Sequence, residues 1–180
     1  MPGPVESEIK LRVDGPEAAR RAVAALGAAR AQPRHLEDNV LYDDGRSSLL
    51  AGGRALRLRR AAGRAIVTYK GPREDRADGV KSRTEIETDV ADADRFEAIL
   101  VGLGYRKVFR YQKYRESYHW RDAEIVVDET PIGTFLEIEG PVATIHEAAR
   151  ALGRGPKDYI GESYAALFAA AGGTGDMVFP

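Results

Sequence analysis

The sequence predicts an α+β fold in which amphipathic helices cover the apolar face of an antiparallel sheet. Segments such as VESEIKLRV at 5–13 alternate apolar and charged residues, which is typical of a strand with two unlike faces. The segments 14–27 and 92–104 begin close to an aspartate and end at a glycine, as helices do. The pair Ala62-Gly63 lies between two alternating runs and predicts a hairpin turn.

The same patterns, followed along the chain, predict eight strands and four helices in one domain, 1–172. The expected strands are single segments at 5–13, about 34–43, 80–90 and 105–120, and hairpins at 55–71 and 123–140. The expected helices are 14–27, 92–104, 144–153 and 162–172. The glycine-rich end, 173–180, is expected to be a flexible tail.

Composition excludes several classes of function. The 180 residues carry 27 Lys and Arg against 28 Asp and Glu, a net charge of -1, so we expect no nucleic-acid partner. There is no cysteine, which excludes disulfides and thiolate chemistry and suits the cytoplasm, where we expect the protein to lie. No apolar run is long enough for a membrane span, and we expect no membrane association.

One face of almost every expected strand is crowded with charge. Alternate residues of a strand share a face, so residues of one parity belong together. The positions that oppose the apolar ones are Glu6, Glu8, Lys10, Arg57, Arg59, Thr68, Lys70, Arg83, Glu85, Glu87, Tyr111, Lys113, Arg115, Asp128, Glu137 and Glu139. Since the helices need the apolar faces, the charged faces point either to water or into the middle of a closed barrel.

The kind of charge favours the closed barrel. Like charges recur two residues apart, as Glu-x-Glu and Arg-x-Arg, and like charges on one face repel each other unless an opposite charge lies between them. Arginine suits phosphate oxygens. Mg²⁺ is usually held by one or two carboxylates together with substrate phosphates. Acids and bases that share one interior therefore predict a site for a metal and a polyphosphate.

The ordered motifs resemble those of the CYTH superfamily, the triphosphate tunnel metalloenzymes. ESEIK at 6–10 is similar to the family's ExExK signature. Further matches follow in order: DNVLYD (38–43), ALRLR (55–59), TYKGP (68–72), SRTEIE (82–87), YQKYR (111–115), VDETPIG (127–133), FLEIEG (135–140) and DYIGESYAALF (158–168). The resemblance implies an eight-stranded antiparallel β-barrel, the triphosphate tunnel, with helices packed on its outside and a triphosphate bound within.

The resemblance also implies a role for each residue. Metal ligands for Mg²⁺ or Mn²⁺ would be Glu6, Glu8, Glu137, Glu139 and Asp128, and the catalytic group would be Glu6, Glu8, Lys70 and Asp128. The triphosphate would be held by Lys10, Arg57, Arg59, Lys70, Arg83, Lys113 and Arg115. Glu85 and Glu87 would either touch the metal or form ion pairs with Arg57 or Lys113. Tyr164 belongs to a segment that resembles the plug of one tunnel mouth, and we expect it to have a packing role.

The chemistry stays open between several reactions. Length and motifs are most similar to the class IV adenylyl cyclase-like group, which converts ATP to cyclic AMP and pyrophosphate. The alternative is hydrolysis of the terminal phosphate by an inorganic tripolyphosphatase, a thiamine triphosphatase or a nucleoside triphosphatase. A polyphosphate or nucleotide sensor without turnover is a third reading, and a barrel for apolar ligands is disfavoured by the charges. The partner is thus ATP, tripolyphosphate or thiamine triphosphate, the segments 43–53 and 72–80 would line a tunnel mouth, and a homodimer is compatible with the resemblance.

Overall fold

The computed structural model describes residues 3–75 and 77–180, so positions 1, 2 and 76 of the expected domain 1–172 lie outside it. The described strands are β1 (Val5–Val13), β2 (Ala29–Asp43), β3 (Ala55–Ala61), β4 (Arg64–Lys70), β5 (Glu74–Asp75), β6 (Lys81–Asp89), β7 (Arg106–Trp120), β8 (Ala123–Thr130) and β9 (Gly133–Glu139). The described helices are α1 (Pro16–Ala25), α2 (Ser48–Ala51), α3 (Ala93–Gly102), α4 (Val142–Ala151), the 3₁₀ turn η1 (Pro156–Asp158) and α5 (Tyr164–Ala170).

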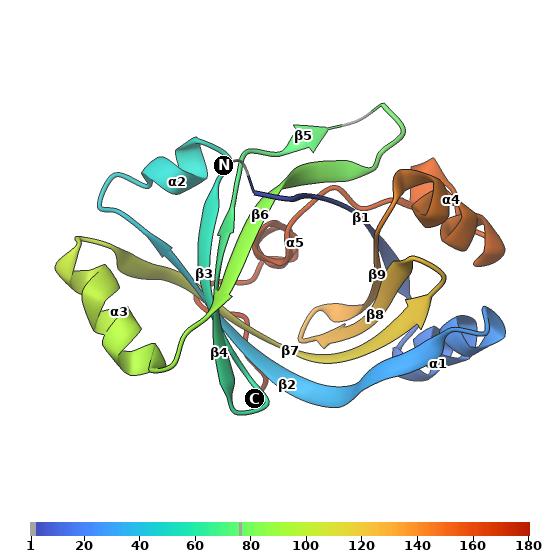
Figure 1. Cartoon of the computed structure of the whole chain (residues 1–180), viewed down its shortest axis with the longest axis horizontal. Helices are drawn as coiled ribbons and strands as arrows, with labels where there is room; N and C mark the ends of the chain where they lie inside the picture. The colour runs from blue at the N-terminus through green and yellow to red at the C-terminus, as the bar shows by residue number, and fades with distance from the viewer. Residues whose placement is uncertain (1–2, 76) are drawn as a thin grey trace.

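Eight of these strands close into an antiparallel barrel, as predicted (Figure 1). Their order is β1-β9-β8-β7-β2-β3-β4-β6, and the pairing of β1 with β6 closes the ring. The two-residue β5 pairs with the beginning of β6. Closure removes the exposed edges of the sheet and creates an interior, here called the lumen, toward which alternate residues of every strand point.

The apolar faces of the strands lie outside and are covered by helices. Ile9, Ile125 and Ile138 pack with Val23 of α1 and Ile145 of α4. On the opposite side of the barrel, α3 covers a second apolar cluster that includes Val40, Tyr42 and Leu58 (Figure 1). Burial of these faces against helices leaves the charged faces of the strands for the lumen, which confirms the predicted division.

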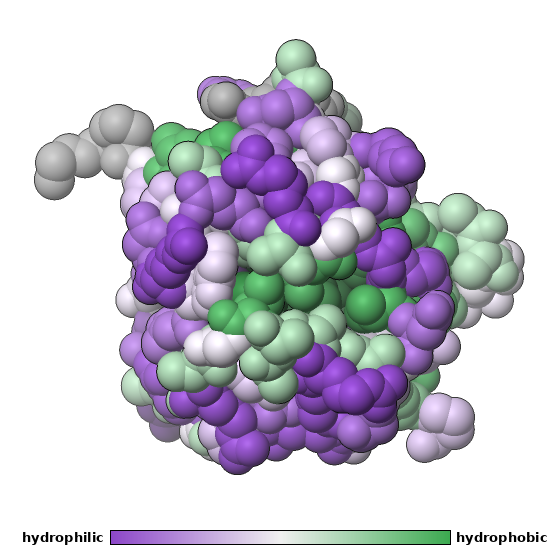
Figure 2. Space-filling view, turned by 90° about the vertical axis from the view of Figure 1, so that its right-hand side faces the viewer, coloured by the Kyte–Doolittle hydropathy of each residue, from purple (hydrophilic) through white to green (hydrophobic). Residues whose placement is uncertain are grey.

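Seen from the side of α1 and α4, the surface is mostly polar, with an apolar area in its middle (Figure 2). Among the described residues, no helix is both long and apolar enough to cross a membrane. The predicted hairpin at Ala62-Gly63 is confirmed, since both residues have positive φ, 48° and 76°, as a tight two-residue turn between β3 and β4 requires.

The chain end differs from the expected flexible tail. Residues 173–180 follow α5 and run along β7, where Met177 forms a bridge with Tyr111 and is fully buried. Composition alone suggested a free end because the glycines promote disorder. The contact forms because the fold leaves one edge of β7 open at Tyr111. This tertiary arrangement cannot be predicted from the local sequence of 173–180.

Candidate functional site

The lumen encloses a cavity of about 280 Å³ whose wall is mainly charged. Among the described residues, nine cationic side chains line it: Lys10, Arg57, Arg59, Lys70, Arg73, Lys81, Arg83, Lys113 and Arg115. Seven carboxylates share the wall: Glu6, Glu8, Glu85, Glu87, Glu124, Glu137 and Glu139. The rest of the lining is Leu41, Ala55, Tyr111, Ser163, Tyr164 and Ala165.

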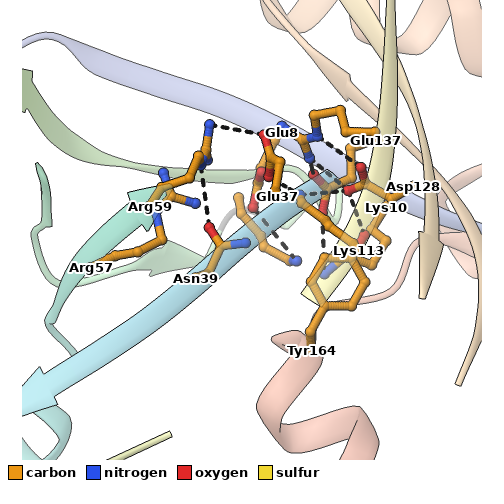
Figure 3. Close-up of polar contacts among 12 residues, drawn as sticks. Glu8, Lys10, Glu37, Asn39, Arg57, Arg59, Lys113, Asp128, Glu137 and Tyr164 are labelled. Carbon is orange, nitrogen blue, oxygen red and sulfur yellow. Dashed lines mark hydrogen bonds and ion pairs between the residues drawn. The ribbon is translucent and has the colours of Figure 1, made fainter. Parts of the chain in front are cut away.

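Every site residue predicted from the sequence lines this cavity except Asp128. Asp128 is fully buried behind the wall and accepts four hydrogen bonds (Figure 3). Lys113 Nζ donates at 2.8 Å, Arg115 donates through Nε at 2.7 Å and Nη2 at 2.6 Å, and the Tyr164 hydroxyl donates at 2.9 Å. In this arrangement, Asp128 fixes two of the cationic side chains that face the cavity.

A second buried carboxylate, Glu37, supports the same cationic wall (Figure 3). It lies 3.2 Å from Arg59 Nη1 and 3.5 Å from Lys113 Nζ. Burial by itself would raise the pKa of Glu37, but Lys113, Arg115 and Arg59 together lower it well below its ordinary value. Glu37 is therefore ionised, and it compensates part of the positive charge.

Arg57 is held from the other side. Its Nη2 donates to Thr68 Oγ1 and to Glu87 Oε1, each at 2.9 Å, which gives Glu87 one of its two expected roles, that of an ion-pair partner. Arg57 Nε and Asn39 Nδ2 are buried donors for which the described residues supply no acceptor. Because an unsatisfied buried donor is costly, the Nε group of Arg57, which lines the cavity, fits an anionic ligand there.

Glu85, the other residue with two expected roles, also lies among cations. It forms ion pairs with Lys70 and, at 3.1 Å, with Arg83. These cations lower its pKa although burial opposes them. Burial also lowers the pKa of Lys70, to which the nearby Arg57 and Arg83 contribute. A polyanion among these side chains would relieve the repulsion between the three cations.

Carboxylates face each other in another part of the lumen. The register places Glu8 opposite Glu139, and Glu139 opposite Glu124, in one row across β1, β9 and β8. Like charges directly opposite in a sheet are destabilising. Burial, followed by Glu8 and Glu85, raises the pKa of Glu139 to about 7. Burial, followed by Glu139 and Glu85, also raises the pKa of Glu6.

These acids do not form a finished cage. No three His, Asp or Glu side chains of residues 3–75 and 77–180 are already gathered around a point where a metal ion could bind. Glu137, two residues before Glu139 on the same face of β9, already forms ion pairs with Arg115 at 2.6 Å and Lys10 at 3.5 Å. Oxygen donors that repel each other nevertheless suit a hard divalent cation, which would draw them together.

Tyr164 does more than the expected packing. Its ring packs in an apolar cluster with Phe135 and Met177, while its hydroxyl reaches Asp128. Lys10 Nζ lies 4.1 Å from the centre of the ring and donates to the Glu162 carbonyl oxygen at 3.0 Å. The first turn of α5 thus closes one side of the cavity and orients two groups of the charged wall.

The structure adds lining or supporting residues that sequence reasoning missed, chiefly Glu37, Lys81 and Glu124. The alternation of strand faces could have identified each of them. Val40 and Tyr42 are apolar, so Glu37 belongs to the opposite face of the same strand. Glu124 and Lys81 have the parity of Asp128 and Arg83, but they lie just outside the motifs. Burial, followed by Lys10, lowers the pKa of Lys81 to about 8.

The chain is similar to a known domain family and to curated proteins. A family model described as the CYTH domain matches residues 5–164. A candidate adenylate cyclase of Methanocaldococcus jannaschii is 31% identical over 149 residues, which cover 82% of this chain and 83% of the relative. Adenylate cyclase CyaB of Aeromonas hydrophila is 30% identical over 139 residues, 76% of this chain and 69% of the relative.

Several solved structures share this fold. A candidate adenylate cyclase of Vibrio parahaemolyticus has a TM-score of 0.80 at 21% identity, covering 93% of this chain and 99% of that one. PH1819 of Pyrococcus horikoshii has a TM-score of 0.75 at 27% identity, covering 92% and 99%. A Hippeastrum candidate adenylyl cyclase, described as having a dominant triphosphatase activity, has a TM-score of 0.69 at 21% identity, covering 92% and 96%.

Proposed function

The chain belongs to the CYTH domain family, and on that premise we propose that it is a divalent-metal-dependent enzyme acting on a triphosphate inside the barrel. The observation that carries this proposal is the cavity wall, where nine cationic side chains and seven carboxylates of the described residues face one enclosed space. Bases alone would suit a sensor of anions. Glutamates that face one another would repel the anion in such a sensor. In a site that also holds a metal, they would serve as its ligands.

The cationic side chains would bind and orient the phosphates. Arg57 and Arg59 come from β3, and Lys113 and Arg115 come from β7, on the two sides of β2. Glu37, Asp128 and Glu87 hold them, as Figure 3 shows in part. Their positions are therefore fixed before a ligand arrives, which reduces the entropic cost of binding. Lys10 and Lys70 complete the wall from β1 and β4.

Glu6, Glu8 and Glu139 are the residues that would hold Mg²⁺ or Mn²⁺. They share the cavity with the cations, and their mutual repulsion fits a divalent ion. Bound there together with phosphate oxygens, the metal would neutralise negative charge on the substrate and help to position the nucleophile. Glu137 lies near Glu139 on β9, and it could give up its ion pair with Lys10 or Arg115 to bind the metal. For Asp128, four donors already occupy the carboxylate, and we assign it the positioning of Lys113 and Arg115.

For the reaction, we propose adenylyl cyclase chemistry, conversion of ATP to cyclic AMP and pyrophosphate. The two curated relatives, at 30% and 31% identity, support it through their names. The family's ExExK motif does not decide between attack by the ribose hydroxyl and attack by water, because both reactions need the same cations and metal.

Hydrolysis of a terminal phosphate is the second candidate, and a separate observation favours it. The cavity has a volume of only about 280 Å³ and is lined chiefly by charged side chains. Such a space suits a triphosphate much better than a purine base. A triphosphatase would need nothing more, whereas a cyclase would have to hold the nucleoside at the mouth of the lumen.

Product analysis distinguishes these reactions. The protein is incubated with ATP and, separately, with tripolyphosphate, in Mg²⁺ and then in Mn²⁺, and the products are resolved by chromatography. Cyclic AMP with pyrophosphate would support the cyclase. Orthophosphate, released faster from tripolyphosphate than from ATP, would support the triphosphatase. Binding of tripolyphosphate without any product, whether metal is present or chelated, would contradict both and leave a sensor.

A further inference from the structure

The strand β7 is longer than its neighbour β8, and this difference leaves part of the β7 edge that faces β8 without a barrel partner, while β2 pairs with the other edge. β8 pairs with β7 only from Tyr114 to Trp120. Residues 176–179, here called the C-terminal segment, take the place of β8 farther along. Met177 N donates to Arg110 O at 3.0 Å, and Gln112 N donates to Met177 O at 2.8 Å.

Two side chains strengthen this attachment. Asp176 Oδ1 accepts from Arg110 N at 2.8 Å, and Gln112 Oε1 accepts from Phe179 N at 3.3 Å. Four hydrogen bonds therefore tie a short segment to one edge of β7. Open sheet edges are commonly covered in this manner, so the attachment alone would be a structural device.

What lies behind the attachment connects it to the site. Met177 and Tyr111 are opposite each other in a parallel bridge, and both side chains pack in the same cluster with Phe135 and Tyr164. The Tyr164 ring lies 5.3 Å from Phe135 and 6.3 Å from Tyr111. Met177 is fully buried in this cluster.

The two tyrosines face the cavity directly. Both belong to its lining, and the Tyr164 hydroxyl donates to Asp128, which holds Lys113 and Arg115. Burial would raise the pKa of Tyr111, but Arg57, Lys113 and Arg59 lower it, which reflects how closely its hydroxyl lies to the cationic wall. A shift of Met177 would thus reach the phosphate-binding groups through two aromatic rings.

We propose that the C-terminal segment is a positioning element of the triphosphate site, in which Met177 sets Tyr111 and Tyr164 and thereby the cations behind them. The inference rests on the proposed function, and the segment lies beyond residues 5–164, the part that the family model covers. Met177 contacts no substrate in this account and acts only through the tyrosines.

Phe179 provides a matched control within the same segment. Its ring lies 5.1 Å from that of Tyr114, which has the opposite parity on β7 and carries the Arg34 guanidinium 3.5 Å from its ring centre. Phe179 therefore packs on the outer face of the barrel. Phe179→Ala removes a larger apolar side chain than Met177→Ala does, and it leaves the backbone hydrogen bonds of the segment in place.

The test is calorimetric titration with inorganic tripolyphosphate in the presence of a chelator, so that only the cationic wall is measured. We expect Met177→Ala to raise the Kd on the order of tenfold, the usual scale of coupling between contacting residues. Met177→Leu should restore the affinity because it conserves volume, and Phe179→Ala should match the wild-type protein. Equal Kd values for Met177→Ala and wild type would overturn the proposal, as would an equal loss in Phe179→Ala.

Amide hydrogen exchange gives a readout that needs no ligand. We expect faster exchange in β7 around Tyr111 and in α5 for Met177→Ala, and no such change for Phe179→Ala. A wild-type protein that binds tripolyphosphate neither with Mn²⁺ nor with a chelator would contradict the proposed function, while hydrogen exchange would still test the packing of Met177. Unchanged exchange at both places in Met177→Ala would then overturn the positioning role.

Discussion

In one part of the lumen the carboxylates have cationic neighbours, and in another part they have acidic neighbours. Around Asp128 and Glu37, each acid is surrounded by arginine and lysine, and cations hold the pKa of Glu37 low. In the row of Glu8, Glu139 and Glu124, acid faces acid, and burial with these neighbours raises the pKa of Glu139 to about 7. The acids of the first part are held in ion pairs, whereas the acids of the second part repel each other.

This difference indicates a division of labour. The paired acids hold the cationic wall in place, so that part is organised for a polyanion before binding. The facing acids carry excess negative charge that a divalent cation would neutralise. A ligand that brings metal and phosphate together would satisfy both parts at once, and the predictions below test each part separately.

The largest effect is expected in the acidic part. Glu8→Gln and Glu139→Gln should each reduce metal-dependent turnover on the order of 1000-fold, because a neutral amide binds a hard cation poorly. Turnover of ATP and tripolyphosphate is the measurement. Glu147→Gln, an exposed change on α4 beside Arg121, is the control. Full activity in both lumen variants would refute the metal assignment.

The next effect is on stability, in the paired part. Asp128→Asn removes the buried counterion that Lys113 and Arg115 share and leaves them only Glu37 and Glu137. We expect a loss of about 3 kcal/mol in the free energy of unfolding. Urea denaturation measures it. Asp94→Asn, which breaks an ion pair at a carboxylate that is 93% exposed, should cost less than about 1 kcal/mol. Comparable losses in the two variants would contradict the central role of Asp128.

A smaller effect is expected when the cationic wall is weakened. Arg57→Ala combined with Arg59→Ala should reduce affinity for tripolyphosphate about 30-fold, the scale of a charge-assisted hydrogen bond. Arg60→Ala on the same strand is a matched control, since Arg60 points outward to Asp94 and Glu97. Titration calorimetry measures both variants. If Arg60→Ala weakened binding as much, the affinity would come from general charge and not from the lumen.

The smallest expected effect is the dependence of metal stabilisation on pH. The pKa of Glu139 is about 7 in the folded protein and 4.5 ordinarily, so the folded state binds the extra proton. Without metal, this group makes the protein less stable as pH rises from about 4.5 to 7. Glu37 and Glu137 have lowered pKa values and stay ionised throughout this range.

Divalent metal should offset this loss of stability at a pH above the pKa of Glu139, where the proton no longer competes with the metal for the carboxylate. We expect Mn²⁺ to raise the Tm by about 3 °C more at pH 8 than at pH 5.5, which corresponds to about 1 kcal/mol for a chain of this size. Scanning calorimetry of wild type and Glu139→Gln makes the comparison. A stabilisation by Mn²⁺ that is the same at the two pH values, or that survives in Glu139→Gln, would count against this assignment.

Much of the lumen could be predicted because strand periodicity is strict. Residues such as Lys10, Arg57 and Glu137 could be assigned to one face by parity, and helices confirmed the choice by covering the other face. Glu37 was not predicted because the alternation rule was not applied to its strand. The apolar Val40 and Tyr42 would have assigned Glu37 to the lumen face. The prediction therefore failed there through incomplete use of a local rule.

Other features lie beyond local rules. The row from Glu8 to Glu124 depends on the register of three strands, which parity does not determine. The docking of Met177 on β7 depends on the unequal lengths of β7 and β8, and the hydroxyl of Tyr164 reaches Asp128 only because α5 closes the lumen. These are tertiary contacts between segments far apart in the chain.

The most direct test of the account is titration of Mn²⁺ into the wild-type protein with and without tripolyphosphate, followed by electron paramagnetic resonance and calorimetry. The account predicts that tripolyphosphate and Mn²⁺ bind together, each strengthening the other, and that Glu139→Gln loses this coupling while Arg60→Ala keeps it. Tripolyphosphate bound with equal affinity whether Mn²⁺ is present or chelated would contradict the claim that the lumen is one metal and triphosphate site.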